Sequence, residues 1–246
     1  MLFRSLADFR SDTVTEPTRR MLESLLDIKK FDDCVLGTDE NVNRFEQKMA
    51  NLFNKESGLF MLSGTMANQI AVATAASQEQ SPMSLIGHSH CHLLKWESAG
   101  IAHHSRVLPI MTRDYQLSSF KNLSNLKSDV HIAKTKLLLL ENTLDGQVIE
   151  YTQMKELYEF GKMNKMHIHL DGCRIWHAAI KTNLELNNFG EVSDSISLCF
   201  SKALGAPIGA MLLGTTKFIE HAKYYRKMMG GGIRQASGIS ILSSVN

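Results

Sequence analysis

Residues 167–176 read HIHLDGCRIW, in which a short apolar run ends at a carboxylate and a helical pattern follows. The run His167 to Leu170 has the length of a strand, and apolar residues then recur at helical spacing at Ile175, Trp176 and Ala179. Strands that pass directly into helices build parallel sheets covered by helices. This junction therefore predicts an α/β domain in which Asp171 stands at the end of a strand.

The same alternation of strand-like and helix-like segments runs along most of the chain. Apolar residues spaced by threes and fours predict one helix over 40–53, with Val42, Phe45, Met49, Leu52 and Phe53 on its buried face, and others around 117–123 and 154–158. Apolar runs of strand length separate these helices, at residues 58–62, 84–86, 107–110, 137–140, 167–170, 195–200 and 210–213. We expect them to form buried strands of a mostly parallel sheet, which binds ligands at the carboxyl ends of its strands.

Composition narrows the kind of ligand. The chain has 246 residues, of which 43% are hydrophobic, and a formal net charge of +2 from 27 basic and 25 acidic residues. A charge this small and evenly spread predicts binding neither to nucleic acid nor to a membrane surface. The longest apolar runs, such as Leu137 to Leu140, are far shorter than the roughly 20 residues that cross a bilayer. The expected ligand is therefore a small molecule.

The cysteines and the N-terminal residues indicate the cellular compartment. Cys34, Cys91, Cys173 and Cys199 are scattered without a C-x-x-C pair, which argues against a zinc ribbon or a disulfide scaffold. The first ten residues carry two arginines, but they also carry an aspartate and lack the apolar stretch of a cleaved leader. We expect reduced cysteines and a cytoplasmic protein, with a mitochondrial location as the alternative.

Lys202 follows the apolar run Ile196 to Phe200 and precedes the small residues Gly205, Pro207 and Gly209. A lysine in such a loop can be partly desolvated, which lowers its pKa and makes the neutral amine available for Schiff-base chemistry. Taken alone, a lysine past a strand is more commonly an exposed side chain that reaches into water.

Asp171 changes that balance. A carboxylate at the end of the strand 167–170 can pair with the protonated ring nitrogen of pyridoxal phosphate, or it can cap the helix that follows. Arg174 comes one helical turn later, so it can face the same cleft and grip a substrate carboxylate, unless it is an ordinary surface arginine. Ser63, Gly64 and Thr65 precede a helical pattern and can bind a phosphate at its positive end, although these residues also make ordinary caps.

Two sets of alternating side chains support a competing hypothesis, a metal-dependent hydrolase. These sets are His88, His90 and His92, and His167, His169 and Asp171. On an extended chain, each set projects to one side and could chelate a metal ion. A metal site explains neither Lys202 nor the candidate phosphate loop, so we favour a cofactor enzyme without a metal.

Six segments in order along the chain resemble those of the low-specificity L-threonine aldolases. They are DFRSDTVT (8–15), SGTMANQ (63–69), LENT (140–143), HLDGCRIW (169–176), SKALGAP (201–207) and GGGIRQ (230–235). The resemblance implies the aspartate aminotransferase fold, fold type I of the pyridoxal-phosphate enzymes. It also implies cleavage of threonine or allo-threonine to glycine and acetaldehyde, and assembly into a homodimer or homotetramer.

The resemblance also assigns the residues that would hold the cofactor. Lys202 would form the Schiff base with pyridoxal 5'-phosphate, and Asp171 would pair with its ring nitrogen. The phosphate would be served by Gly64, Thr65 and Ser201. Arg234 would reach a cofactor site across a subunit interface.

The substrate and the proton transfers would fall to other positions. Arg174, on the cofactor side of the cleft, would hold the substrate carboxylate together with Ser11. His92 would stack on the cofactor ring. Either His92 or His131, the latter placed near the substrate hydroxyl, would act as the base that starts cleavage of the Cα–Cβ bond.

This chain departs from the family pattern at several positions. Leu36 stands where the family usually has a tyrosine, Gly87-His88 and His90 replace a common Cys-Asp and arginine, and Cys173 replaces an alanine. We expect residues 1–30 to form an N-terminal arm and first helix, residues 31–246 to form the cofactor-binding domain, and the small C-terminal domain of the family to be absent or truncated. A catalytically impaired remnant that keeps the fold is therefore the second functional hypothesis.

Overall fold

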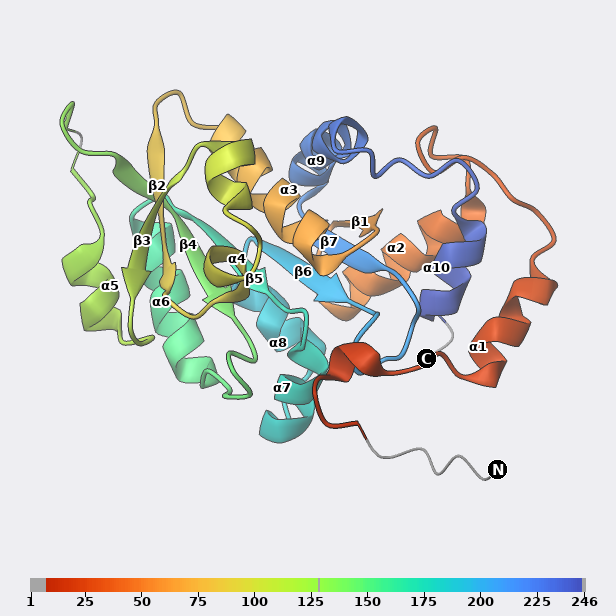
Figure 1. The fold of residues 1–246 in the computed structure, drawn as a ribbon. Helices are drawn as coiled ribbons and strands as arrows, with labels where there is room; N and C mark the ends of the chain where they lie inside the picture. The colour runs from red at the N-terminus through yellow and green to blue at the C-terminus, as the bar shows by residue number, and fades with distance from the viewer. Residues whose placement is uncertain (1–7, 128, 245–246) are drawn as a thin grey trace.

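A computed structural model describes residues 8–127 and 129–244 of the chain (Figure 1). The first seven residues of the N-terminal segment, and Val245 at the end of the last apolar segment, lie outside this part. No helix among the described residues is long and apolar enough to cross a membrane. The architecture is a single sheet with helices on both faces, as expected for an α/β fold.

The sheet has seven strands in the order β1-β7-β6-β5-β4-β2-β3. Their bounds are β1 Ser57–Met61, β2 Met83–His88, β3 Leu108–Thr112, β4 Lys134–Glu141, β5 His167–Asp171, β6 Ser195–Cys199 and β7 Ala210–Gly214. All seven coincide with predicted strands to within a few residues, and the sheet is mostly parallel. β7 is the exception, because it pairs antiparallel with both β1 and β6.

The sheet is mostly parallel, as expected, and connection length explains why β7 is the exception. A parallel neighbour requires a crossover of a dozen or more residues, usually a helix. Only residues 200–209 connect β6 to β7, and they contain no helix. The chain therefore returns antiparallel, and this short connection keeps Lys202 beside the carboxyl end of β6.

Helices cover both faces of the sheet. They are α1 Arg19–Glu23, α2 Glu40–Leu52, α3 Gly64–Ser77, α4 His92–Lys95, α5 Leu117–Leu123, α6 Tyr151–Met163, α7 Ile175–Thr182, α8 Leu186–Glu191, α9 Thr216–Met228 and α10 Ser237–Ser244. Shorter turns are η1 Asp12–Val14 and η2 Ser24–Asp27, both 3-10, and η3 Ile101–Ser105, which is π-helical. Helices α3 and α9 pack on one face, and α2, α6, α7, α8 and α10 pack on the other.

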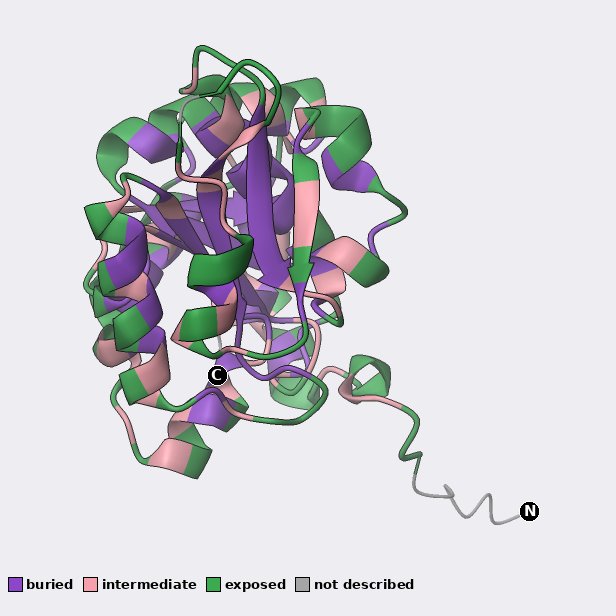
Figure 2. Ribbon diagram, turned by 90° about the vertical axis from the view of Figure 1, so that its left-hand side faces the viewer, coloured by how far each residue is buried: buried purple, intermediate pink, exposed green. Residues whose placement is uncertain are grey.

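The sheet separates two hydrophobic cores, and β4 contributes to both. Leu138 and Leu140 belong to one core, and Leu137 and Leu139 to the other, as the two-residue period of a strand requires. All four side chains are fully buried. The strands at the centre of the molecule are largely coloured as buried (Figure 2). A continuous apolar run in the sequence thus marks a strand covered on both faces.

Two predicted buried positions are exposed. Leu52 lies at the margin of the apolar face of α2, about 80° around the helix from Val42, and its side chain is 42% exposed. Strand β3 was expected to be buried, but it is the edge strand and pairs only with β2. Its Leu108 and Met111 are about half exposed for that reason.

Candidate active site

The candidate site lies at the carboxyl ends of β4, β5 and β6. Glu141 ends β4 and is directly opposite Asp171, which ends β5. Lys202 is the third residue after the end of β6. The three side chains line one recess, together with His92, Asn142, Thr143, Cys173 and Arg174. The sequence thus placed Lys202 and Asp171 correctly at the same edge of the sheet.

Asp171 is a buried carboxylate, and each of its two oxygens accepts a hydrogen bond. Its Oδ2 accepts a hydrogen bond of 2.7 Å from Asn68 Nδ2, and its Oδ1 accepts one of 3.0 Å from the backbone amide of Cys173. Burial raises the pKa of Asp171, but the nearby Lys202 ammonium and these hydrogen bonds outweigh it, so the pKa lies below its ordinary value. Asp171 therefore presents a negative charge to the recess.

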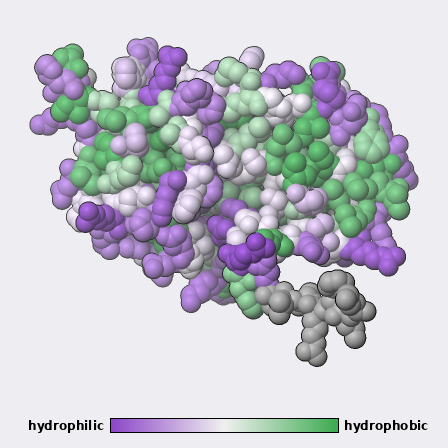
Figure 3. Space-filling view, in the orientation of Figure 1, coloured by the Kyte–Doolittle hydropathy of each residue, from purple (hydrophilic) through white to green (hydrophobic). Residues whose placement is uncertain are grey.

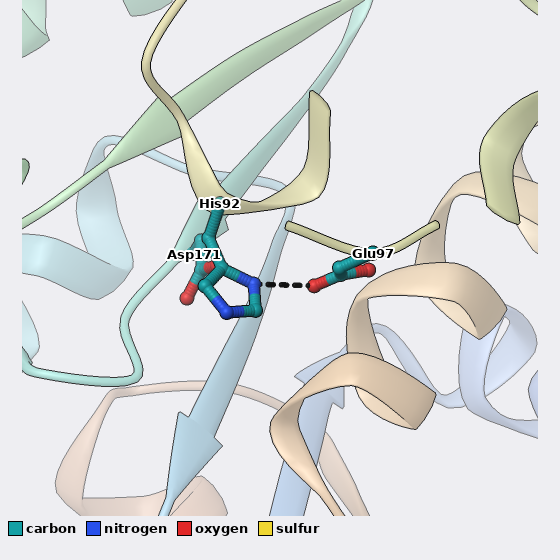
Figure 4. Close-up of side chains that lie close together, drawn as sticks. All are labelled: His92, Glu97 and Asp171. Carbon is teal, nitrogen blue, oxygen red and sulfur yellow. Dashed lines mark hydrogen bonds and ion pairs between the residues drawn. The ribbon is translucent and has the colours of Figure 1, made fainter. Parts of the chain in front are cut away.

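His92 begins α4 and is held from two sides. Its backbone amide donates to Glu141 Oε2 at 2.6 Å, and its ring Nδ1 lies 2.9 Å from Glu97 Oε1 (Figure 4). Glu97 is buried, whereas about a third of the His92 side chain is exposed. In the neutral ring, donation from Nδ1 leaves Nε2 unprotonated and able to accept a proton. His92 is thus an oriented, accessible imidazole beside Asp171.

The structure assembles neither of the two predicted metal sets. His88 stacks on Tyr115, His90 Nδ1 lies 3.0 Å from Asp145 Oδ2, and His92 turns to Glu97. His167 and His169 both contact the hydroxyl of Ser195 instead of lining a common site with Asp171. Each of these histidines thus has a protein partner, and among the described residues neither alternating set converges on one site.

A different trio, His92, Glu97 and Asp171, places possible ligand atoms within 4.8 Å of one another. The amide nitrogen of Asn68 donates to both carboxylates of this trio, at 2.9 Å to Glu97 and 2.7 Å to Asp171. N–H donors between two carboxylates already supply the positive partner that a cation would otherwise provide. This arrangement does not favour a metal ion.

The backbone of the Lys202 loop is fixed by two contacts. The carbonyl of Lys202 accepts a hydrogen bond of 2.8 Å from the amide of Gly205, and it also accepts one from the hydroxyl of Thr15. Gly205 adopts a left-handed φ of 72°, and a side chain there would crowd the carbonyl of Glu16. The N-terminal segment thus packs against the loop that carries Lys202.

Arg174 is engaged by Asp12, from η1. Its Nη2 and Nε lie 2.8 Å and 3.1 Å from Asp12 Oδ1. Nη1 makes no hydrogen bond to any residue within 8–127 or 129–244, so this end of the guanidinium is available to a ligand. Arg174, Asp12 and Ser11 line an outer cleft of about 1090 Å³, which shares His92, Glu141, Thr143 and Arg174 with the recess. Ser11 and Arg174 therefore face one space, as predicted.

The candidate phosphate residues gather behind this recess. Ser63 caps α3, where its hydroxyl accepts from the amide of Met66, and Thr65 is exposed at the same helix end. A Cβ on Gly64 would come within 2.6 Å of Cys173 Sγ, so only glycine fits against the loop after β5. Ser201 lies close by, because its hydroxyl is 3.4 Å from the sulfur of Cys199, which Gly64 also faces.

Two predicted site residues lie elsewhere. His131 precedes β4, and a strand of eight residues, roughly 25 Å long, separates it from Glu141 at the carboxyl edge. Within one chain His131 therefore lies away from the recess, and its predicted place near the substrate stays a prediction. Arg234 is exposed, pairs with Asp33, and lines neither the recess nor the cleft. Its predicted action across a subunit interface stays a prediction.

Four residues of the site had no predicted role: Asp12, Asn68, Glu97 and Glu141. Asn68 and Glu141 belong to segments with the family pattern, and Asp12 is part of a third. Two of them contact residues more than a hundred positions away in the sequence. Asp12 contacts Arg174, and Asn68 contacts Asp171. Only their position inside shared motifs could have indicated Asp12, Asn68 and Glu141, and Glu97 lies outside the six segments.

Glu141 supplies a pH-dependent contribution to stability in the cofactor-free protein. Burial, and then the charge of Asp171, raise its pKa from 4.5 to about 8. The folded state therefore retains a proton that the unfolded state has lost, and stability falls as pH rises through that window. We expect Glu141→Gln to be more stable than the parent by about 1 kcal/mol or more at pH 8 and equally stable below pH 4.5, as measured by chemical unfolding. A pH-independent difference would contradict this assignment.

The donor set fits pyridoxal phosphate, the cofactor that the fold implies. The ionised Asp171 is suited to a protonated ring nitrogen, Lys202 to a carbonyl carbon, and His92 to the face of a flat ring. The start of α3, a helix of 14 residues, suits a phosphate through its free amides. The recess itself is small, about 10 Å³, but its wall includes the flexible side chain of Lys202, and it opens into the large cleft.

Known proteins resemble the chain over nearly its whole length. The sequence profile of the beta-eliminating lyases matches residues 8–245. The low specificity L-threonine aldolase of Saccharomyces cerevisiae is 39% identical and aligns with 97% of this chain and 62% of its own length. The enzyme of the same name from Escherichia coli K12 is 38% identical, with 95% and 70% covered.

Solved structures share the fold. The threonine aldolase of Leishmania major superposes with a TM-score of 0.84 at 16% identity and covers 96% of this chain and 70% of its own. The chain spans 62% of the length of its yeast relative. The sequence profile, the two aldolases and the fold agree, and the chain belongs to the beta-eliminating lyase family, with low-specificity L-threonine aldolases among its relatives.

Proposed function

We propose that this chain forms the cofactor-binding part of a pyridoxal-phosphate lyase that cleaves L-threonine or L-allo-threonine to glycine and acetaldehyde. The family is pyridoxal-phosphate-dependent. The observation that carries the proposal is the recess in which Lys202 and the buried, ionised Asp171 lie together beside His92. A structural lysine needs neither a buried carboxylate nor an oriented imidazole next to it.

Each residue of the recess has a task. Bound pyridoxal phosphate supplies an electron sink for the pair that remains on Cα when the Cα–Cβ bond breaks. Asp171 holds a proton on the ring nitrogen, and Lys202 is the covalent attachment point. His92, oriented by Glu97, would lie against the ring and is our candidate base for the substrate hydroxyl, because within one chain His131 lies at the other edge of the sheet.

Arg174 binds the substrate carboxylate with its free Nη1 edge, while Asp12 fixes the other edge. We expect Arg174→Gln to raise KM for the amino acid by about 10- to 100-fold, because the variant loses a charge-assisted hydrogen bond. Asp12→Asn should raise KM less, because it loosens Arg174 without removing it. Lys181→Ala, at another cation of the same cleft, is the matched control. An unchanged KM in Arg174→Gln would place the substrate carboxylate elsewhere.

A turnover assay separates this proposal from a catalytically impaired remnant. The purified chain is saturated with pyridoxal phosphate, and acetaldehyde release from L-threonine and L-allo-threonine is followed. Release that depends on the cofactor supports the lyase. Cofactor binding without release favours the remnant.

The assembly that we propose is a homodimer or homotetramer, and the proposed location is the cytoplasm. Exposed apolar side chains gather around α1 and the segment that follows it (Figure 3); they are Leu22, Leu25, Leu26, Phe31 and Leu36. The pair between Arg234 and Asp33 lies within this region, which is consistent with an Arg234 that acts at an interface. The four cysteines are buried and free, as suits a reducing compartment.

A further inference from the structure

The side chain of Asn68, in the second turn of α3, uses its full hydrogen-bonding capacity. Its Nδ2 donates to Asp171 Oδ2 at 2.7 Å and to Glu97 Oε1 at 2.9 Å. Its Oδ1 accepts from Ser197 Oγ at 2.6 Å and lies 3.1 Å from His169 Nε2. A carboxamide has two N–H donors and two acceptor lone pairs, so none remains. The residue is completely buried.

The partners fix which way this amide faces. Ionised Asp171 can only accept, so the NH₂ group of Asn68 must face it, and the carbonyl oxygen must face His169 and Ser197. His169 therefore carries its proton on Nε2. Burial lowers the pKa of His169 to about 3, which keeps the ring neutral and leaves Nδ1 as an acceptor.

The hydrogen-bond directions can be followed from His169 to Ser195 and His167, further from the recess. The bare Nδ1 of His169 lies 2.8 Å from Ser195 Oγ and accepts its proton, so that hydroxyl must in turn accept from His167 Nε2, also at 2.8 Å. Every donor in this series points toward the carboxylates of Asp171 and Glu97. Gln69 Nε2, at 2.6 Å, completes the contacts of Glu97.

The side-chain amide of Asn68 contacts two carboxylates that have separate proposed roles toward the cofactor. Asp171 is the proposed partner of the cofactor ring nitrogen, and Glu97 orients His92, the proposed ring-stacking side chain. Resting on the proposed function, we infer that Asn68, held by His169 and Ser197, is a positioning residue that ties these two cofactor contacts together. A polar residue that merely filled the core would require neither a fixed direction nor contact with both carboxylates.

The inference is tested by changing His169, which is fully buried and lines neither the recess nor the outer cleft. His169→Leu removes the donor to Asn68 Oδ1, whereas the amide of His169→Gln retains an N–H donor close to the position of Nε2. We expect His169→Leu to weaken pyridoxal phosphate binding by about 10-fold or more, and to shift the absorption band of the bound cofactor, because Asn68 is free to turn. His169→Gln should bind within about threefold of the parent.

Thr74→Val is the matched control. Thr74 is buried on the same helix, and its hydroxyl has no partner in the part of the chain that the structure describes, so this variant changes a buried polar group without touching the series. It should bind the cofactor as the parent does. If Thr74→Val and His169→Leu weakened pyridoxal phosphate binding equally, His169 would matter only for core packing, and the inference would be overturned.

The tautomer of His169 gives a second test that needs no cofactor. Ring nitrogen NMR of the cofactor-free protein should show His169 neutral and protonated on Nε2, and protonation on Nδ1 would contradict the directed series even if His169→Leu failed to fold. Cofactor binding by His169→Leu as tight as that of the parent would overturn the inference alone. A parent protein that binds no pyridoxal phosphate would overturn the proposed function as well.

Discussion

Lys202→Ala should yield a protein that folds normally but carries no covalently attached cofactor. The amine of Lys202 is the one in the recess beside Asp171, and no other lysine lines it. We expect the absorption band of the attached cofactor to vanish and acetaldehyde release to fall by about 10³-fold or more, within the range known for loss of a positioned proton-transfer group. Absorption spectra and turnover of the two proteins measure both effects.

The matched control for this change is Lys217→Ala. Lys217 lies at the start of α9, in a hollow at the opposite edge of the sheet with His167 and Asp194. It should leave both colour and turnover unchanged. A Lys202→Ala protein that stays yellow after dialysis would show that another lysine holds the cofactor.

Asp171→Asn should retain the fold and lose most of the activity. An asparagine has the same size and keeps one oxygen, which can accept from the amide of Cys173 or from Asn68, but its NH₂ group then faces the other donor, so one of the two hydrogen bonds is lost. It cannot hold a proton on a ring nitrogen by charge, and the electron sink is weakened. We expect turnover to fall by about 10²- to 10³-fold, as for removal of a preorganised electrostatic group, with weaker cofactor binding by fluorescence titration.

Asp194→Asn is the control for the loss of a strand-end carboxylate. Asp194 accepts from the amide of Ile168 at 2.9 Å and pairs with Lys162 at the amino edge of the sheet, so its loss affects local packing and not the recess. Its turnover should match that of the parent. Comparable losses in Asp171→Asn and Asp194→Asn would mean that Asp171 acts only through stability.

The sequence alone predicted the alternation of strands and helices along the chain, and it predicted that Lys202 and Asp171 follow strands. Lys202 and Asp171 each follow directly after an apolar run, so the position of the run fixes the position of the side chain. The residues of β7 do not indicate whether the strand runs parallel or antiparallel, because an apolar run fits a buried strand of either direction. The length of the 200–209 connection held that information.

The remaining parts of the site depend on contacts that no local pattern encodes. His131 looked close to Glu141 along the chain, yet an intervening strand carries them to opposite edges. Asp12 meets Arg174, and Asn68 meets Asp171, only after the N-terminal segment and α3 have packed against β5 and β6. Buried hydrogen-bond series of this kind are properties of the assembled fold.

Borohydride reduction of the protein saturated with cofactor, followed by peptide mass spectrometry, shows whether Lys202 holds pyridoxal phosphate. We predict a reduced cofactor adduct on the peptide that contains Lys202 and on no other lysine peptide. An adduct on a different lysine, or a protein with no adduct and stoichiometric zinc, would contradict the account.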